Sequence, residues 1–248
     1  MRDEKIYIYG KHALVEALTK RPELIERVYL AAPLDGELAA LVQQHRIQTE
    51  KFDPRSAPHE VAADAVHQGY IGRASASRLT QSYGDFVEGL SVTDDTALVV
   101  LGEVQDPQNV GAIIRTAAAF GIKGVLIPEH NQAQVTGTVV KVSAGMAFTV
   151  PLVSIGNVNT TLKDLKERGF WIYGLDGEAK QSLTTEKFDA PTVFVLGNES
   201  TGIREKTLEA CDVPLVIPMN PGCESLNVAA SAAVALYAWS VRHPGALR

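Results

Sequence analysis

The pattern of apolar and polar positions predicts a small mixed domain at the start of the chain. Short apolar runs with the two-residue period of strands alternate there with amphipathic runs that have the period of a helix. The expected strands are residues 6–9, 27–30 and 70–74, and the expected helices are residues 13–18, 37–44 and 58–65. Short strands and helices in this alternation indicate a small α/β domain, which we expect at residues 1–79.

The next segment, residues 80–95, has the composition of a polar connection. It contains Ser82, Gly89 and Ser91, and it ends on the pair Asp94-Asp95. Gly, Ser and Asp mark turns and loops more often than they fill the interior of a helix or strand. We therefore expect a linker at residues 80–95.

From Thr96 onward the apolar runs become continuous. The expected strands are residues 97–101, 124–127, 170–175, 192–196 and 213–217, and the expected helices between and after them are residues 110–120, 162–168, 203–210 and 226–240. Strands that are buried on both faces and alternate with helices indicate a parallel sheet with right-handed crossovers. Residues 96–248 are thus expected to form an α/β domain of the nucleotide-binding type.

Composition supports an ordinary globular protein. Of the 248 residues, 46% are hydrophobic and 21% are charged, which excludes a fibrous repeat or long disorder. No apolar run is long enough to cross a membrane, and the first residues, Met1 to Lys5, lack the apolar core of a secretion signal. We expect a cytoplasmic protein without a membrane partner.

The charge distribution leaves room for nucleic acid, although the net charge of −6 argues against it at first. Residues 1–79 hold 11 basic and 11 acidic residues and four of the six histidines. The remaining residues hold 12 basic against 18 acidic ones, so the whole acidic excess lies there. A neutral N-terminal part could bind RNA through local patches.

Several kinds of site are disfavoured by missing motifs. The two cysteines, Cys211 and Cys223, are too few for a disulfide framework, and we interpret them as reduced thiols. No His, Cys or Asp cluster has the spacing of metal ligands, so no metal is expected. A Walker-type loop, a Gly-x-Gly-x-x-Gly loop and a Gly-x-Ser-x-Gly elbow are also missing, which disfavours kinases, NTPases, dinucleotide enzymes and Ser-His-Asp hydrolases.

Three loops directly follow predicted strands and are the candidate ligand sites. They span residues 103–111, 197–204 and 218–227. Ligands of open parallel sheets bind beyond the carboxyl ends of the strands. The loops combine Gly with uncharged amides and hydroxyls, a composition that suits adenosine better than a triphosphate.

Each loop also has a purely structural interpretation. Asp106 with Pro107 and Asn109 could form a turn and cap the next helix, and Ser225 could cap the last helix. Glu199 could simply pair with Arg204. Arg115 is harder to explain in this way, because a lone charge on a helix of Ala, Ile and Phe needs a partner or a ligand.

In this order the three loops resemble the three motifs of the SpoU (TrmH-type) branch of the SPOUT methyltransferases. The motifs are Asp106-Pro107-x-Asn109-x-Gly111-x-x-x-Arg115, Leu196-Gly197-x-Glu199-x-x-Gly202-Ile203-Arg204, and Ile217-Pro218-Met219 followed by Ser225-Leu226-Asn227. The segment from Lys141 to Met146 is similar to a further sequence motif that is typical of this family. Residues 8–18 and His67-Gln68-Gly69 resemble the substrate-binding domain of the family. The resemblance covers nearly the whole chain.

The resemblance implies an RNA ribose 2′-O-methyltransferase that uses S-adenosylmethionine and works as a homodimer. It also implies a deep trefoil knot near the second and third motifs, which periodicity cannot reveal. The two-domain layout is most similar to enzymes that methylate a guanosine ribose in large-subunit (23S) ribosomal RNA, so RNA is the expected partner of residues 1–79.

The resemblance further assigns roles to single residues. The expected cofactor-binding residues are Leu196, Gly197, Asn198, Ile217, Met219, Ser225 and Leu226. The expected catalytic residues are Arg115, Asn109, Glu199, Ser225 and Asn227. Arg115, from its own or the partner subunit, would contact the ribose hydroxyl or the adjacent phosphate and promote deprotonation. Asn109 and Glu199 would orient Arg115 and the ribose, and Ser225 and Asn227 would line the site. The expected RNA-binding residues are Lys11, His12, His67 and Arg115, although histidines in turns are most often plain surface residues.

Two departures from the family pattern keep other functions open. Gln108 stands where many relatives carry His, and residues 198–201 replace a more Gly-rich version of the second motif. The alternatives are a tRNA ribose methyltransferase, a non-catalytic RNA-binding or ribosome-assembly factor, and a resistance enzyme that methylates a ribosomal adenosine. Intact Asn109, Arg115 and Glu199 disfavour the non-catalytic one.

Overall fold

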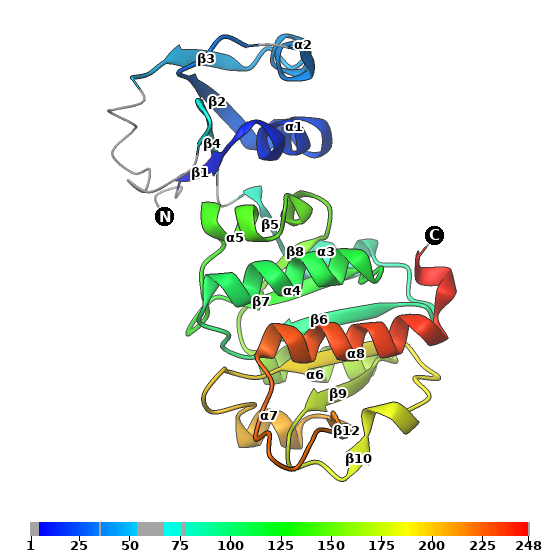
Figure 1. The fold of residues 1–248 in the computed structure, drawn as a ribbon. Helices are drawn as coiled ribbons and strands as arrows, with labels where there is room; N and C mark the ends of the chain where they lie inside the picture. Colours follow the sequence, from blue (N-terminus) through cyan, green and yellow to red (C-terminus); the bar gives the residue numbers. More distant parts are fainter. Residues whose placement is uncertain (1–4, 35, 54–66, 76–77, 248) are drawn as a thin grey trace.

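Two sheets, a small mixed one and a large parallel one, organise the chain (Figure 1). The computed structural model describes residues 5–34, 36–53, 67–75 and 78–247. The predicted helix at residues 58–65 lies outside them. Among the described residues, no helix combines the length and apolar character that crossing a membrane requires.

The small sheet has the strand order β1-β4-β2-β3. Its strands and helices are β1 (Lys5–Tyr9), α1 (Lys11–Lys20), β2 (Ile25–Leu30), α2 (Gly36–Gln44), β3 (Gln48–Lys51) and β4 (Tyr70–Ser75). β4 pairs antiparallel with both β1 and β2, whereas β3 is parallel to β2. The predicted strands and the helices at 13–18 and 37–44 are confirmed. β3 was not predicted because all four of its residues are exposed, so it has no apolar pattern.

The large sheet has the strand order β10-β12-β9-β11-β6-β7-β8-β5, and every pair of neighbours in it is parallel. Its strands are β5 (Thr80–Ser82), β6 (Ala97–Leu101), β7 (Gly124–Pro128), β8 (Leu152–Ile155), β9 (Trp171–Leu175), β10 (Gln181–Ser182), β11 (Thr192–Leu196) and β12 (Val213–Val216). Its helices are α3 (Tyr83–Gly89), α4 (Pro107–Ala119), α5 (Gly137–Val142), α6 (Val158–Glu167), α7 (Glu205–Glu209) and α8 (Val228–Arg242). The predicted parallel α/β domain is confirmed.

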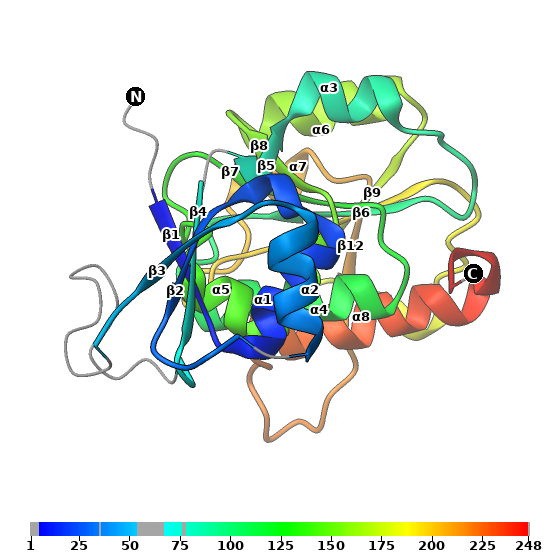
Figure 2. The same cartoon turned by 90° about the horizontal axis from the view of Figure 1, so that it is seen from above.

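Helices cover both faces of the large sheet, with α3 and α6 on one side and α4 and α8 on the other (Figure 2). The first side buries Phe86 and Leu162 against the sheet, and the second buries Ile113 and Trp239. Burial on both faces explains why β6 and β11 read as unbroken apolar runs. The short strand β8 and helix α5 escaped prediction.

The prediction of a linker at residues 80–95 is wrong for its first ten residues. β5 extends the large sheet by pairing with β8, and the Ser82 hydroxyl then caps α3 by accepting a hydrogen bond from the Asp85 amide (3.2 Å). Phe86 and Val87 on α3 are buried. The segment looks polar because β5 is an edge strand and α3 exposes most of its surface.

The small domain is seated directly on α5. A Cβ atom added at Gly137, the first residue of α5, would lie 2.0 Å from the backbone oxygen of Tyr7 in β1. Gly145, just after α5, has a left-handed φ of 82°, and a Cβ there would lie 3.2 Å from Cβ of Glu16 in α1. One continuous apolar cluster runs from Ile8 in the small domain to Val139 in α5. The two domains therefore form a packed interface.

We expect Gly137→Ala to lower the free energy of unfolding by about 1–3 kcal/mol, because the added methyl group meets backbone that cannot move aside alone. Gly84→Ala in α3 is the matched control. A Cβ there meets nothing within 4 Å, and alanine favours a helix over glycine. The measurement is thermal unfolding of both variants; equal midpoints would contradict the close approach.

Candidate functional site

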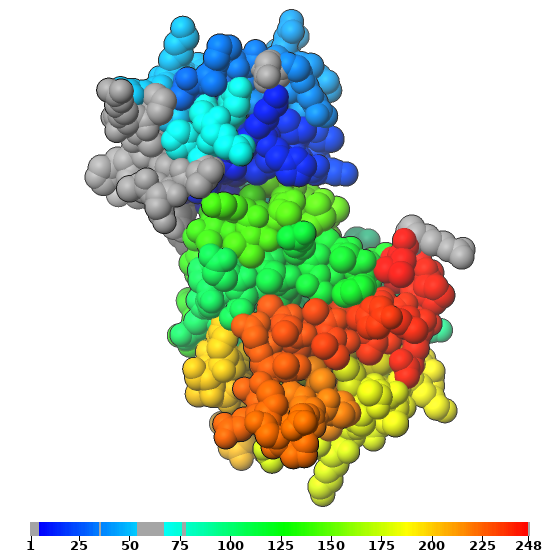
Figure 3. Space-filling view, viewed as in Figure 1, coloured from blue at the N-terminus to red at the C-terminus, as the bar shows by residue number. Residues whose placement is uncertain are grey.

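A cavity of about 250 Å³ opens at the carboxyl ends of β9, β11 and β12. The loops that follow these three strands and the start of α8 line it. In the space-filling view the orange loop before α8 forms part of the surface of the lower half of the molecule (Figure 3). A ligand in this cavity would contact segments that lie far apart in the sequence.

The structure brings all the predicted cofactor-binding residues together at this cavity. Those that line it are Leu196, Gly197, Asn198, Ile217, Met219, Ser225 and Leu226. The lining also includes three carboxylates, on Asp176, Glu199 and Glu224, and neither Lys nor Arg. Such a lining suits a neutral or cationic ligand and disfavours a phosphate group.

The loop after β11 is tightly closed. Asn198 and Gly202 exchange two backbone hydrogen bonds (2.9 and 3.0 Å), and the Asn198 side-chain oxygen accepts from the amide of Ser200 (2.9 Å). A Cβ added at Gly197 would lie 2.3 Å from the carbonyl carbon of Gly202 and 2.4 Å from the nitrogen of Ile203. Only glycine fits at position 197, which fixes the shape of this wall of the cavity.

One chain of hydrogen bonds connects the three motif loops. The Glu199 carboxylate accepts from the backbone amides of Gln105 and Asp106 (3.1 Å each) and from the side-chain amide of Asn109 (2.9 Å). The Asn109 oxygen in turn accepts from Nδ2 of Asn227 (2.9 Å). Asn109 is buried, so these bonds replace water that cannot reach it. The polar residues of the motifs thus hold the loops together.

The chain of hydrogen bonds keeps Glu199 ionised. Burial alone would raise the pKa of its carboxyl, but the bonds donated by Asn109 and by the amides of Gln105 and Asp106 outweigh it and lower the pKa below the ordinary value. Because these donors favour the charged form of Glu199, their hydrogen bonds stabilise the loops at neutral pH. This stabilisation is lost only as the pH falls through the lowered pKa.

Two structural interpretations of the motif residues are wrong. Glu199 does not pair with Arg204, because the Arg204 guanidinium binds the Glu103 carboxylate through two nitrogens (2.7 and 2.9 Å). The N-cap of α8 is Asn227 rather than Ser225; its side-chain oxygen accepts from the amide of Ala229 (2.8 Å). The capping role expected for Asp106 at α4 is confirmed.

Arg115 stands apart from the cavity within this chain. It is exposed on α4, and it follows Asn109 by six residues, which turns its side chain about 120° away around the helix. No hydrogen bond or ion pair joins Arg115 to another described residue, and it does not line the cavity. The expected orientation of Arg115 by Asn109 and Glu199 is therefore not formed in a single chain.

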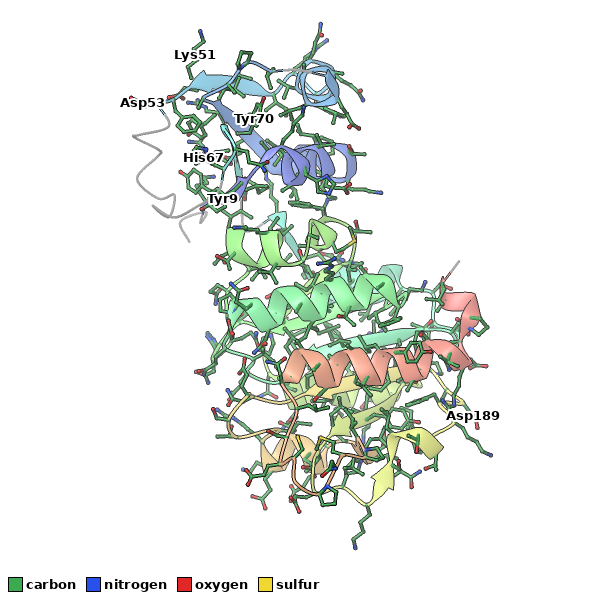
Figure 4. All side chains as sticks on the ribbon, in the orientation of Figure 1. Tyr9, Lys51, Asp53, His67, Tyr70 and Asp189 are labelled. Atoms are coloured by element: carbon green, nitrogen blue, oxygen red, sulfur yellow. The ribbon has the colours of Figure 1, made fainter. Side chains whose placement is uncertain are left out.

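The predicted RNA-binding residues of the small domain lie away from the cavity. Lys11 and His12 are in the first turn of α1, where His12 is exposed. His67 accepts a hydrogen bond from the Gly69 amide at Nδ1 (3.0 Å), and its ring packs edge-on against Phe52 (5.4 Å between centroids). His67 and Tyr9 lie on the side of the small sheet away from α1 (Figure 4).

The loop after β9 was missed in the sequence. Leu175, Asp176 and Gly177 line the cavity, and β9 lies between β11 and β12 in the sheet. The signal was present, since an Asp-Gly pair directly follows the predicted strand 170–175. The order of the strands, which the sequence does not state, brings this pair to the middle of the site.

We expect Glu199→Gln to raise the hydrogen-exchange rates of the Gln105 and Asp106 amides by about tenfold or more. The change replaces one accepting oxygen by an NH₂ group, and hydrogen bonds to a charged group contribute about 1.5–3 kcal/mol. Glu224→Gln, which alters an exposed carboxyl at the same cavity, is the control. Unchanged exchange in Glu199→Gln would refute its anchoring role.

Known protein families and individual proteins match this sequence over nearly its whole length. A model of the SpoU rRNA methylase family matches residues 96–237, and one for RNA 2′-O ribose methyltransferase substrate binding matches residues 7–80. The chain is 34% identical over 234 residues to 23S rRNA (guanosine-2′-O-)-methyltransferase RlmB of Nitrosomonas europaea, covering 93% of this chain and 89% of the relative. The enzyme of that name from Escherichia coli K12 is 34% identical over 235 residues, covering 93% and 96%.

A solved structure shares the fold. The SpoU methyltransferase AviRb from Streptomyces viridochromogenes, in complex with the cofactor AdoMet, superimposes with a TM-score of 0.81 at 20% identity. The match covers 97% of this chain and 91% of that one. Both domains are therefore arranged as in a known protein.

Proposed function

The chain belongs to the SpoU rRNA methylase family, and from this premise we propose that it methylates the 2′ oxygen of a guanosine ribose in 23S ribosomal RNA with S-adenosylmethionine. The observation that carries the proposal is the cavity at which all three motif loops meet, joined through Glu199, Asn109 and Asn227. The RlmB relatives at 34% identity support the guanosine of 23S rRNA as substrate.

The residues at the cavity fit S-adenosylmethionine. This cofactor carries a sulfonium and an ammonium group, and the described residues that line the cavity include three carboxylates and neither Lys nor Arg. The close approach of Gly197 to the backbone of Gly202 and Ile203 fixes the wall against which the nucleoside would pack. Backbone around Gly197, Ile217 and Leu226 would hold the adenosyl group. The bound cofactor would supply the activated methyl group.

The protein must then align the ribose oxygen and help it lose its proton. We assign the alignment and the stabilisation of the developing alkoxide to the cationic guanidinium of Arg115, while the proton of the hydroxyl would pass to solvent water. Asn109, Glu199 and Asn227 would keep the loops in the reactive arrangement, and Ser225 would contact the ribose from the cavity wall.

A homodimer would bring Arg115 to a cavity. Three exposed apolar residues follow one another along α8, Val234, Tyr237 and Val241, with 40%, 58% and 60% of their surface accessible. The Tyr237 ring contacts Phe120 at the end of α4, the helix that carries Arg115. A second copy covering this surface would bury it and would receive Arg115 from its partner.

We also propose the deep trefoil knot of the family for residues near the second and third motifs. The sheet order supports it. β12 lies beyond β9 from β11, yet α8 returns to pack against α4, and residues of the segment 217–227 line the same cavity as the loop 197–204.

The small domain would bind RNA outside the cavity, with Lys11, His12 and His67 as the expected contacts. Its match to the substrate-binding family model supports this. The site of action would be the cytoplasm, where ribosomal RNA is found. No group of three or more His, Cys, Asp or Glu in the described ranges could hold a metal, and we propose a reaction without one.

The experiment is transfer of labelled methyl from S-adenosylmethionine to unmodified 23S rRNA and, separately, to bulk tRNA, followed by mapping of the modified nucleotide. Label on one guanosine ribose of 23S rRNA is the expected result. Label only in tRNA would support the proposed methyl-transfer reaction but refute 23S rRNA as the substrate. No label in either RNA, despite cofactor binding, would favour an assembly factor.

A further inference from the structure

Asp176 lines the cavity at the carboxyl end of β9. It follows β9 directly, and β9 lies between β11 and β12, whose loops form the opposing walls. Its backbone amide donates to the Leu215 carbonyl of β12 (3.0 Å), and its carbonyl accepts from Ala179 (3.3 Å). The main chain that carries this carboxylate is therefore fixed by the sheet on one side and by a turn on the other.

The carboxylate of Asp176 retains capacity to accept hydrogen bonds. Within the described chain, Oδ1 accepts one long bond from the Glu178 amide (3.3 Å), and no bond reaches Oδ2. Both oxygens of Glu199, by contrast, are already engaged by three donors. Glu224 is exposed on the loop before α8. Of the three carboxylates, Asp176 alone is half-buried, fixed by the sheet and largely free to accept from a ligand.

We infer that Asp176 accepts hydrogen bonds from the vicinal 2′ and 3′ hydroxyls of the ribose of the adenosyl cofactor. The inference rests on the proposed function, in which the loops on either side of Asp176 hold the adenosyl group. The nucleoside would lie between them, and its hydrogen-bond donors are the two ribose hydroxyls and the adenine amino group. A carboxylate matches a vicinal diol with two parallel acceptors, the chemistry used by an acidic residue near a strand end in dinucleotide-binding folds.

The competing role for Asp176 is an ion pair with the ammonium group of the methionine part. The two roles predict different ligand dependences. 5′-Methylthioadenosine keeps the ribose diol but lacks the amino-acid tail, and its 3′-deoxy analogue lacks one hydroxyl of the diol. S-Adenosylhomocysteine carries both the diol and the ammonium group.

The test measures the affinities of these three ligands by calorimetry, with competition for the weak ones, for the full chain and for Asp176→Asn. The asparagine oxygen can still accept from the Glu178 amide, so the turn is kept. We expect affinity for S-adenosylhomocysteine and for 5′-methylthioadenosine to fall about tenfold or more, while affinity for the 3′-deoxy analogue falls less than about threefold. Glu167→Gln, which removes an exposed carboxylate of α6 that does not line the cavity, should change none of them by more than about threefold.

Each other outcome decides the matter as well. Equal affinities in Asp176→Asn and wild type, or a loss seen with S-adenosylhomocysteine but not with 5′-methylthioadenosine, would overturn the inference. Failure of the wild-type protein to bind S-adenosylhomocysteine would overturn the proposed function instead. Should Asp176→Asn unfold, Asp176→Ser, whose hydroxyl can also accept from the Glu178 amide, replaces it with the same expectations.

Discussion

Replacing Arg115 by alanine should lower turnover by about a hundred- to a thousandfold, with affinity for S-adenosylmethionine unchanged. Removing one group that stabilises a developing oxyanion has an effect of this size. Arg115 neither lines the cavity nor bonds to a described residue, so its loss should not disturb the fold. The measurement is single-turnover methyl transfer to 23S rRNA beside cofactor calorimetry.

The control for Arg115→Ala is Lys163→Ala, which removes an exposed cation from α6 on the other face of the large sheet. It should leave turnover within about twofold of wild type, as surface charges far from a site generally do. Near-normal turnover in Arg115→Ala would show that another group acts on the ribose hydroxyl.

Replacing Gly197 by valine should abolish detectable cofactor binding, a loss of at least about a hundredfold. The new side chain would begin 2.3 Å from backbone of the same loop, so the cavity wall has to change shape. Gly222→Ala on the loop before α8 is the control, because a Cβ there makes only an ordinary contact with the Asn220 side chain (3.5 Å). Cofactor affinity within about threefold of wild type in Gly197→Val would contradict the proposed pocket.

The two variants together test whether Arg115 acts across the dimer. In a mixed dimer of Arg115→Ala and Gly197→Val subunits, the intact cavity belongs to one subunit and the intact arginine to the other. Action from the partner restores transfer at that one site. Action within a subunit leaves the mixture inactive.

The sequence predicts the strands of the large sheet well because these strands are buried on both faces. It fails at β3 and β5, since an edge strand with exposed side chains carries no apolar period, and it also misses the four-residue strand β8, whose apolar run is short. The three motif loops were found because each directly follows a buried run. Their mutual contacts, such as Asn109 with Asn227, depend on distant segments meeting and could be expected only through family resemblance.

Strand order explains the other gaps between sequence and site. Asp176 follows a strand that was predicted, yet nothing local indicates that β9 lies between β11 and β12. The exposure of Arg115 could not be predicted for a similar reason. Helical periodicity gives the face of α4 on which Arg115 lies, but it does not say whether another segment packs against that face. The docking of the small domain, shown by the close approaches at Gly137 and Gly145 and by the shared apolar cluster, likewise depends on contacts between distant segments.

That docking has a consequence for how RNA is selected. Because β1 and α1 pack closely against Gly137 and Gly145, the separation between the methyl donor and RNA bound by the small domain would be set by packing rather than by a flexible linker. The enzyme would then select RNA by the distance, through its folded structure, between the element bound by the small domain and the nucleotide to be methylated. A guanosine at the wrong distance from the element that is held would be rejected whatever its sequence context.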